Sequence, residues 1–150
     1  FKEDPTNVDS YFRDISTFGG STAGPAAAIE VLKIIKREKL LENVNEVGEH
    51  LKNKLLELQE KHEMIGEVRG KGLFCGVELV KDRASKEPVD ETVAAGVAAH
   101  CFKNKVMIGR TNRSFETNNN VLLFSPAFIC TKTDIDLIVE SVDNALEANK

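Results

Sequence analysis

The stretch STFGGSTAGPAAAIE, residues 16–30, decides how this chain is organised, because it passes abruptly from small polar residues into a helix. Gly24 followed by Pro25 is a good helix start, since the fixed φ of proline and its missing N–H suit the first helical turn. The hydroxyls, glycines and free backbone N–H groups of residues 16–22 therefore precede a helix N-terminus, which carries positive partial charge. This arrangement predicts an anion pocket that suits a phosphate. An ordinary loop with an N-cap serine or threonine accounts for the same residues.

Downstream of Pro25, apolar residues recur at three- and four-residue spacing to about Glu60, with charged residues between them. This periodicity is typical of an amphipathic helix. A continuous helix of this length would exceed the usual ~8–20 residues. We therefore expect two consecutive helices with a bend near Glu38–Leu41, or one long helix that bridges two bodies of a larger protein. The apolar positions are Ile29, Leu32, Ile35, Leu40, Val44, Val47, Leu51, Leu55 and Leu58.

The rest of the chain alternates short apolar stretches with helical periodicity. Residues 73–80 predict a strand, residues 81–88 a polar turn and residues 91–103 a helix. Two short strands are expected at 106–109 and 121–126, followed by a helix that Thr133 caps and that runs to Ala148, with Asp134 and Asp136 in its first turn. This order predicts an α+β fold, in which long connector helices precede a small, mostly antiparallel sheet covered by helices.

Composition indicates a globular protein and argues against several classes of partner. The chain has 150 residues, of which 41% are hydrophobic and 29% charged, and this suffices for one domain with a real core. A formal net charge of -4 offers no basic patch for nucleic acid, and no apolar run approaches the ~20 residues that cross a bilayer. The three cysteines form no CxxC pair, so we expect small buried side chains in a reduced, cytoplasmic protein.

Three further groups of residues could carry chemistry, and each has an ordinary structural explanation. Residues 69–72, RGKG, suit a phosphate but could equally form a tight turn before a strand. In the polar stretch 109–120, Arg110 or Arg113 could bind a carboxylate if the stretch faces a cleft, and a solvated loop is the alternative. His50 and His62 lie among helical charges, which predicts surface positions. The sequence shows neither metal-ligand spacing nor a nucleophile with its base.

Three blocks of sequence, in order and over nearly the whole chain, resemble the C-terminal third of the class III aminotransferases, within the fold-type I group of pyridoxal-phosphate enzymes. The STFGG and AGPAAA segments of the first block are most similar to members of the taurine–pyruvate and ω-amine–pyruvate type. The blocks are RDISTFGGSTAGPAAAIEVLKIIKREKLLENV (13–44), HEMIGEVRGKGLFCGVELVKDRASKEP (62–88) and NVLLFSPAFICTKTDIDLIVESVDNALE (120–147).

The resemblance implies roles for individual residues. Ser16 and Thr17 match the place of the family's phosphate-binding threonine, which is donated across the dimer interface to the pyridoxal 5'-phosphate of the partner subunit. The family's substrate-carboxylate arginine matches Arg110, with Arg113 as the alternative, because the loop before Pro126 is longer here than in the family. The lysine that holds the cofactor covalently, and the aspartate that pairs with its pyridine nitrogen, lie upstream of these blocks. The resemblance therefore implies that the 150-residue chain alone is inactive.

The resemblance also implies the organisation and activity of the whole protein. Residues 1–24 would end a large cofactor domain, residues 25–61 would form connector helices, and residues 62–150 would form the small C-terminal α+β domain. The complete enzyme would be a homodimer that transfers an amino group from a ω-amine or amino acid to a keto acid such as pyruvate.

Two other interpretations stay open. One is a different class III activity, such as a 4-aminobutyrate or ornithine aminotransferase or an aminomutase. The other is a stand-alone α+β module, either an interaction or regulatory module or a protein that binds a small anion through the loop at residues 16–22. A stand-alone module predicts no exposed apolar face. If the chain is instead a piece of an enzyme, we expect an exposed apolar face on the helix from Ala26 to Ile35, which would pack against a partner.

Overall fold

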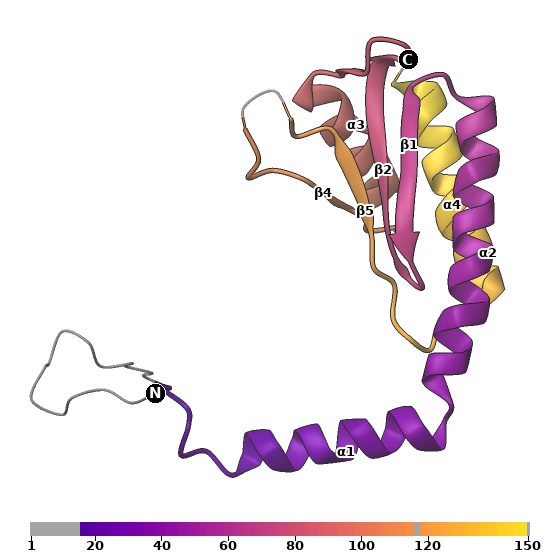
Figure 1. Ribbon diagram of the computed structural model, residues 1–150. Coiled ribbons are helices and arrows are strands. Elements are labelled where there is room, and N and C mark those ends of the chain that lie inside the picture. The colour runs from indigo at the N-terminus through magenta and orange to yellow at the C-terminus, as the bar shows by residue number, and fades with distance from the viewer. Residues whose placement is uncertain (1–15, 116–117, 150) are drawn as a thin grey trace, which may run out of the picture.

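The computed structural model describes residues 16–115 and 118–149, and these residues form an α+β fold (Figure 1). The class expected from the sequence is therefore confirmed. No helix of the described residues is long and apolar enough to cross a membrane. The helices are α1 (Ala23–Arg37), α2 (Leu40–Lys61), α3 (Glu91–Lys103) and α4 (Lys132–Ala148), and the strands are β1 (Ile65–Lys71), β2 (Phe74–Asp82), β3 (Glu87–Pro88), β4 (Gly109–Arg110) and β5 (Val121–Phe124).

The strands form a small antiparallel sheet in the order β1-β2-β5-β4, with β3 also paired to β2. Val77, on the central strand β2, lies opposite Val68 of β1 and Leu122 of β5. Because side chains alternate between the two faces of a strand, Val77 and Leu122 point into the core and are fully buried. Glu78, the next residue along β2, points to the opposite face, where it lies opposite Glu67.

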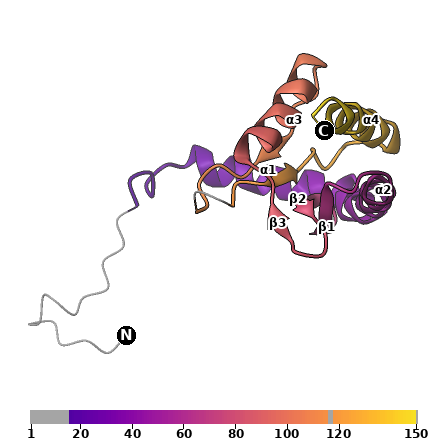
Figure 2. The same ribbon diagram turned by 90° about the horizontal axis from the view of Figure 1, so that it is seen from above.

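Helices α2, α3 and α4 pack on one side of the sheet, and α4 contacts both of the others (Figure 2). On the opposite face, Arg69 bridges Glu67 and Glu78, each at 2.8 Å, and none of the described helices covers them. The helices thus cover one face of the sheet. The core between the helices and the sheet includes Leu51, Leu55, Ile65, Leu79, Val97, Leu122, Ile135, Val142 and Leu146.

The long helical segment is interrupted between α1 and α2, which confirms the bend expected near residues 38–41. Lys39 adopts a left-handed backbone conformation, with φ of 52°, which α-helix cannot continue. Leu40, the first residue of α2, is buried against the body of the molecule. As a result α2 lies along the sheet, whereas α1 leaves the base of α2 and projects away from it (Figure 1).

Helix α2 approaches the turn between β1 and β2 very closely. A Cβ atom on Gly48 of α2 would lie 2.4 Å from the carbonyl carbon of Gly72, so only glycine fits at Gly48. Gly72 itself has a φ of 56°, which glycine adopts without strain. The chain therefore turns at Gly72, and Arg69 lies within the paired strand β1. The tight turn considered for residues 69–72 is therefore present, but it falls at Gly72 and Leu73, and residues 69–71 belong to β1.

Other element boundaries also differ from the expected ones, among them β5, which was expected at 121–126 and ends at Phe124. The strand expected at 106–109 is reduced to Gly109–Arg110, because the Val106 N–H donates to the Cys101 carbonyl at the end of α3. Helix α4 is capped by Thr131 and not by Thr133. The Thr131 hydroxyl accepts from the Asp134 N–H at 3.3 Å, and the Asp134 carboxylate accepts from the Thr131 N–H at 2.8 Å. This reciprocal pair is a capping box.

Candidate functional site

The loop before α1 is folded into successive turns. The Gly19 N–H donates to the Ser16 carbonyl at 3.1 Å, and the Ser21 N–H donates to the Phe18 carbonyl at 2.9 Å. Thr22 occupies the N-cap of α1, but its side chain makes no capping hydrogen bond. The N–H groups of the first turn of α1 thus lack a side-chain cap. The ordinary-loop interpretation expected a serine or threonine at the N-cap, and Thr22 occupies that position without capping the helix through its side chain.

The donor groups of this loop suit a phosphate. Ser16 and Thr17 are both exposed, and neither hydroxyl bonds to another of the described residues. A phosphate offers only acceptor oxygens at neutral pH, so free hydroxyls and an uncapped helix N-terminus complement it. Neither hydroxyl would therefore have to give up a hydrogen bond to another described residue in order to bind an anion. The assignment of Ser16 and Thr17 to a cofactor phosphate stays a prediction at this point.

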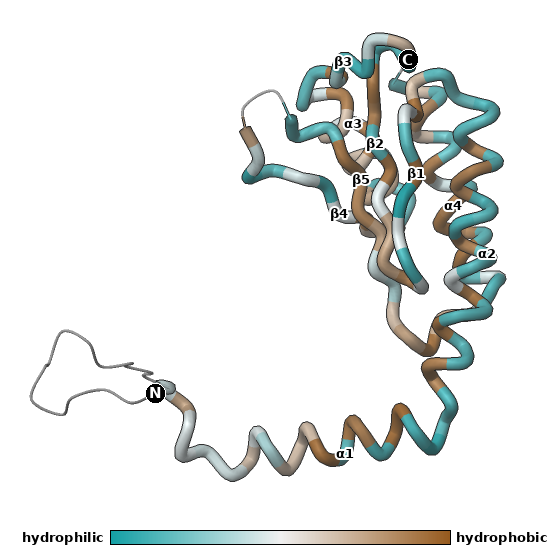
Figure 3. Tube along the Cα trace, in the orientation of Figure 1, coloured by the Kyte–Doolittle hydropathy of each residue, from teal (hydrophilic) through white to brown (hydrophobic). Residues whose placement is uncertain are grey.

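Helix α1 carries an apolar face that nothing in the described residues covers. No residue of α1 is buried, and Ile29 and Leu32 are 55% and 65% exposed. These two side chains are one turn apart and hence lie on the same side of the helix. Figure 3 shows apolar residues along the projecting helix. The apolar face expected of an enzyme piece is therefore present, and the stand-alone module, which predicted no such face, is not supported.

Arg110 is fixed at the end of the sheet. Its backbone pairs with Leu122 of β5, and its guanidinium Nη1 donates to Glu91 Oε1 at 3.0 Å and to the Thr111 carbonyl at 3.1 Å. Arg113 is exposed in the loop that follows, and it makes no ion pair within the described part of the chain. Of the two arginines expected to bind a carboxylate, Arg110 is the one that the fold holds in place.

Glu91, the first residue of α3, was not expected from the sequence to be a site residue. Its Oε2 accepts from the side-chain amide of Asn119 at 3.0 Å, so both of its oxygens are bonded. The hydrogen bonds from Asn119 and from Arg110 hold the pKa of Glu91 below its ordinary value of 4.5. Both partners are far away in sequence, at separations of 19 and 28 residues. No local sequence pattern could have indicated this cluster.

An apolar hollow of about 340 Å³ lies beside β4. Pro126 and the exposed Met107 contribute to its wall. Gly109 of β4 lines the hollow, whereas the side chain of Arg110 is not part of its lining. The hollow is lined by Met107, Ile108, Gly109, Leu123, Phe124, Ser125, Pro126 and Ile138.

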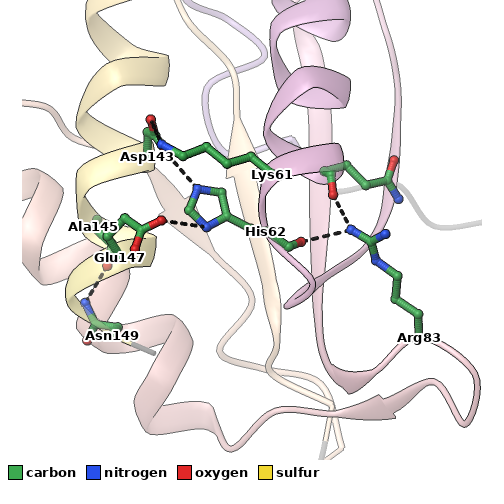
Figure 4. A network of polar contacts seen from close by, with 8 residues as sticks. Lys61, His62, Arg83, Asp143, Ala145, Glu147 and Asn149 are labelled. Carbon is green, nitrogen blue, oxygen red and sulfur yellow. Dashed lines mark hydrogen bonds and ion pairs between the residues drawn. The ribbon is translucent and has the colours of Figure 1, made fainter.

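His62 is buried, with 2% of its surface exposed, and the expected surface position is therefore wrong. Its backbone ends α2, and its ring lies against α4 (Figure 4). Nε2 donates to the Asp143 carboxylate at 2.6 Å, and Nδ1 lies 3.7 Å from Glu147 Oε1. His50 keeps 24% of its side chain exposed and bonds to Asp136 at 2.7 Å. The charged sequence neighbours of His62 concealed its burial, because the covering helix comes from the far end of the chain.

The cluster around His62 combines a hydrogen bond from the imidazole with an ion pair between Lys61 and Asp143. His62, Asp143 and Glu147 could offer ligands to a metal ion. However, the Lys61 ammonium lies 2.7 Å from the Asp143 carboxylate, which His62 also contacts. A cation there would be repelled by Lys61. Arg83 donates to the carbonyls of Gln59 and His62 at the end of α2 and to the Ile65 carbonyl at the start of β1. Figure 4 shows its contact with the His62 carbonyl.

The cysteines are structural within the described residues. Cys75 and Cys101 are buried, and burial raises the pKa of both thiols. Cys130 is half-buried and also has a raised pKa, caused first by burial. Raised pKa values keep thiols protonated and unreactive. The small buried side chains expected from the sequence are confirmed for Cys75 and Cys101, and Cys130 is only partly covered.

The sequence of this chain is similar to that of known proteins. Residues 5–146 match the family model described as aminotransferase class III. The chain is 56% identical to the hypotaurine/taurine–pyruvate aminotransferase of Paracoccus denitrificans, over 97% of this chain and 32% of that protein. It is 53% identical to the taurine–pyruvate aminotransferase of Bilophila wadsworthia, with the same coverage. The chain thus spans about a third of the length of these curated relatives.

Solved structures agree with the sequence comparison. An aminotransferase from Bacillus anthracis superposes with a TM-score of 0.86 at 36% identity, over 92% of this chain and 31% of that one. An amine transaminase from an uncultivated Pseudomonas species, in a form with pyridoxal phosphate bound, gives a TM-score of 0.82 at 28% identity, over 93% of this chain and 30% of that one.

Proposed function

The chain belongs to the class III aminotransferase family, and from this membership we propose that the complete protein transfers an amino group from a ω-amine such as taurine to pyruvate. One observation carries the choice of substrates. The relatives that are 56% and 53% identical are named hypotaurine/taurine–pyruvate and taurine–pyruvate aminotransferases. Because this chain spans only about a third of those proteins, the proposal concerns the complete protein, and the 150-residue chain alone is proposed to be inactive.

The proposed cofactor is pyridoxal 5'-phosphate, which supplies, when bound, an electron sink for the carbon atom that exchanges its amino group. In the proposed homodimer, the Thr17 hydroxyl donates a hydrogen bond to the cofactor phosphate of the partner subunit. Ser16 offers a second hydroxyl, and the uncapped N-terminus of α1 adds positive partial charge. The exposure of both hydroxyls and the missing cap at Thr22 support this assignment.

Arg110 is the proposed anchor for the acid group of the substrate. The planar guanidinium matches a carboxylate through two parallel hydrogen bonds, and it would form one side of the substrate pocket. Pyruvate and the amine donor would occupy this pocket in turn. Arg113 is the alternative anchor, because it is exposed and lies three residues further along the same loop. We also propose a cytoplasmic location, based on three cysteines that form no disulfide.

Other class III activities remain the main competitors of this proposal. A 4-aminobutyrate or ornithine aminotransferase would share the fold, the cofactor contact and the arginine, since these belong to the whole family. An aminomutase would need no keto acid. The stand-alone module lacks support, because α1 carries an exposed apolar face.

The proposal is tested by profiling the complete protein with a panel of amines against pyruvate and 2-oxoglutarate. We expect alanine to form from pyruvate with taurine or another ω-amine, and only in the presence of pyridoxal phosphate. A strict preference for 2-oxoglutarate with ornithine or 4-aminobutyrate would replace the taurine-type assignment with one of its competitors. An isomerised amine formed without any keto acid would indicate an aminomutase.

A further inference from the structure

We propose that Glu91 is a positioning residue, which holds the Arg110 guanidinium by one nitrogen so that its other edge is free for a substrate carboxylate. This inference rests on the proposed role of Arg110 as the carboxylate anchor. Its structural basis is the contact between Arg110 Nη1 and Glu91 Oε1 at 3.0 Å. Glu91 is not itself placed against the substrate, and it acts only through the arginine.

The contacts of Arg110 involve one nitrogen only. Nη1 donates both to Glu91 and to the Thr111 carbonyl. Within residues 16–115 and 118–149, neither Nε nor Nη2 makes a hydrogen bond or ion pair. Because Nε and Nη2 point in the same direction, they form the edge that can bind a carboxylate through two parallel hydrogen bonds. The fold thus fixes one corner of the guanidinium and leaves a bidentate edge available.

Glu91 is itself held firmly enough to position another residue. It begins α3, and its second oxygen accepts from Asn119 at 3.0 Å. Asn119 is 7% exposed, and its side-chain carbonyl accepts from the Ser114 N–H at 3.0 Å. The glutamate therefore connects α3 to both ends of the loop that follows β4. Without such a partner, the long arginine side chain would sample many rotamers. Binding would then have to restrict it to one of them, at a cost in conformational entropy.

Charge and position can be separated at this residue. The Glu91 carboxylate also opposes an incoming carboxylate electrostatically, because both carry negative charge next to one guanidinium. Glu91→Ala removes the contact and the charge. Glu91→Gln removes the charge and keeps one oxygen that can accept from Nη1, while its amide nitrogen replaces the oxygen that accepts from Asn119. If the position of the Arg110 guanidinium matters more than the charge of Glu91, Glu91→Ala weakens binding of the keto acid. Glu91→Gln then leaves this binding unchanged or improves it.

The test uses the complete enzyme with bound cofactor and compares four variants with the wild type. The KM for pyruvate and the kcat at saturating pyruvate are measured for Glu91→Ala, Glu91→Gln, Arg110→Ala and Glu87→Ala. Glu87 is the matched control, since it is an exposed glutamate four residues earlier, paired with Lys81. Thermal melting of each variant separates a binding defect from a folding defect.

We expect Glu91→Ala to raise the KM for pyruvate by about five- to tenfold with kcat within about twofold, as expected when an anchoring group loses its orientation. For Glu91→Gln and Glu87→Ala, the KM for pyruvate should be lower than that of the wild type or exceed it by no more than about twofold. A normal KM for Glu91→Ala, or an equal defect in both Glu91 variants, would overturn the inference while leaving the function intact. An unchanged KM for Arg110→Ala would instead overturn the proposed anchor, and the inference with it.

Discussion

The buried imidazole of His62 joins the end of α2 to α4 through the Asp143 carboxylate. Replacing it by leucine removes one partner of a largely buried hydrogen bond and leaves Asp143 with Lys61 alone. We expect His62→Leu to lower the free energy of unfolding by about 2–4 kcal/mol. Chemical denaturation followed by circular dichroism measures this change.

His50 provides the matched control, because it is also a histidine of α2 that bonds to an aspartate of α4. Its partner Asp136 is 53% exposed, so solvent screens the pair. His50→Leu should therefore change the free energy of unfolding by less than about 1 kcal/mol. Equal losses for the two variants would contradict the distinction between a buried and a screened pair.

The Asp143 carboxylate also makes stability depend on pH. Burial raises its pKa, but hydrogen bonds from Lys61 and then His62 outweigh burial, so the pKa lies below the ordinary value of 3.8. The unfolded chain then binds the proton more readily than the folded one, and stability falls as pH falls. The stabilisation by Asp143 should be complete above the ordinary pKa and should disappear as pH falls through the folded pKa. Acid titrations of wild type and Asp143→Asn should converge at low pH, and a constant gap would refute this.

At the level of single residues, the sequence offered candidates for function, whereas the contacts that hold the fold together were not foreseen. Thr17 and Arg110 were assigned through the resemblance, since motif order is visible in the chain. The burial of His62 and the contact between Glu91 and Arg110 were not foreseen. Both depend on partners that the fold brings from distant segments, and surrounding charges made each residue look solvated.

At the level of elements, the start of α4 offers a direct comparison of two threonines. Thr131 forms the capping box with Asp134, whereas Thr133 lies exposed inside the first turn. We expect Thr131→Ala to lower the free energy of unfolding by about 1 kcal/mol. Thr133→Ala should be neutral or slightly stabilising, because alanine favours helix. Urea unfolding of both variants checks this, and the reverse order would move the cap to Thr133.

The packing of α2 against the β1–β2 turn depends on the absence of a side chain. Gly48→Ala would place a Cβ atom 2.4 Å from backbone of the turn. Backbone cannot move aside cheaply, so we expect a loss of about 1–3 kcal/mol in the free energy of unfolding. Gly24→Ala in α1 meets nothing within 4 Å and should cause no loss. A Gly48→Ala variant with unchanged denaturant midpoint would show that the two segments are not in close contact.

Periodicity predicted the helices well, and it predicted the sheet less well. Helix α3 begins and ends at the expected residues, and the break between α1 and α2 falls within the expected region. Strand β1 was harder to recognise because its glycines and charges resemble a turn, and its pairing with β2 supplies what its own sequence lacks. Strand β4 is short because the residues before it still bond to the C-terminal end of α3, through the hydrogen bond from the Val106 N–H to the Cys101 carbonyl.

At the scale of the whole molecule, the described chain has a packed body and one projecting helix. The body buries its own apolar residues, but α1 buries none. The loop with Thr17 lies at the far end of α1 and is therefore remote from Arg110 in the same chain (Figure 1). A single subunit thus does not bring these two residues together. The proposed homodimer accounts for this separation, since Thr17 would complete the cofactor site of the partner subunit.

Subunit complementation tests this central claim most directly. One subunit of the complete enzyme carries Thr17→Ala, and the other lacks the upstream lysine that holds the cofactor. Alanine formation is measured at low cofactor concentration for each parent and after subunit exchange. If Thr17 acts across the interface, every mixed dimer has one complete site, and an equal mixture should recover about a quarter of wild-type activity. Activity equal to the mean of the two parents would contradict the account, because Thr17 would then serve its own subunit or no cofactor at all.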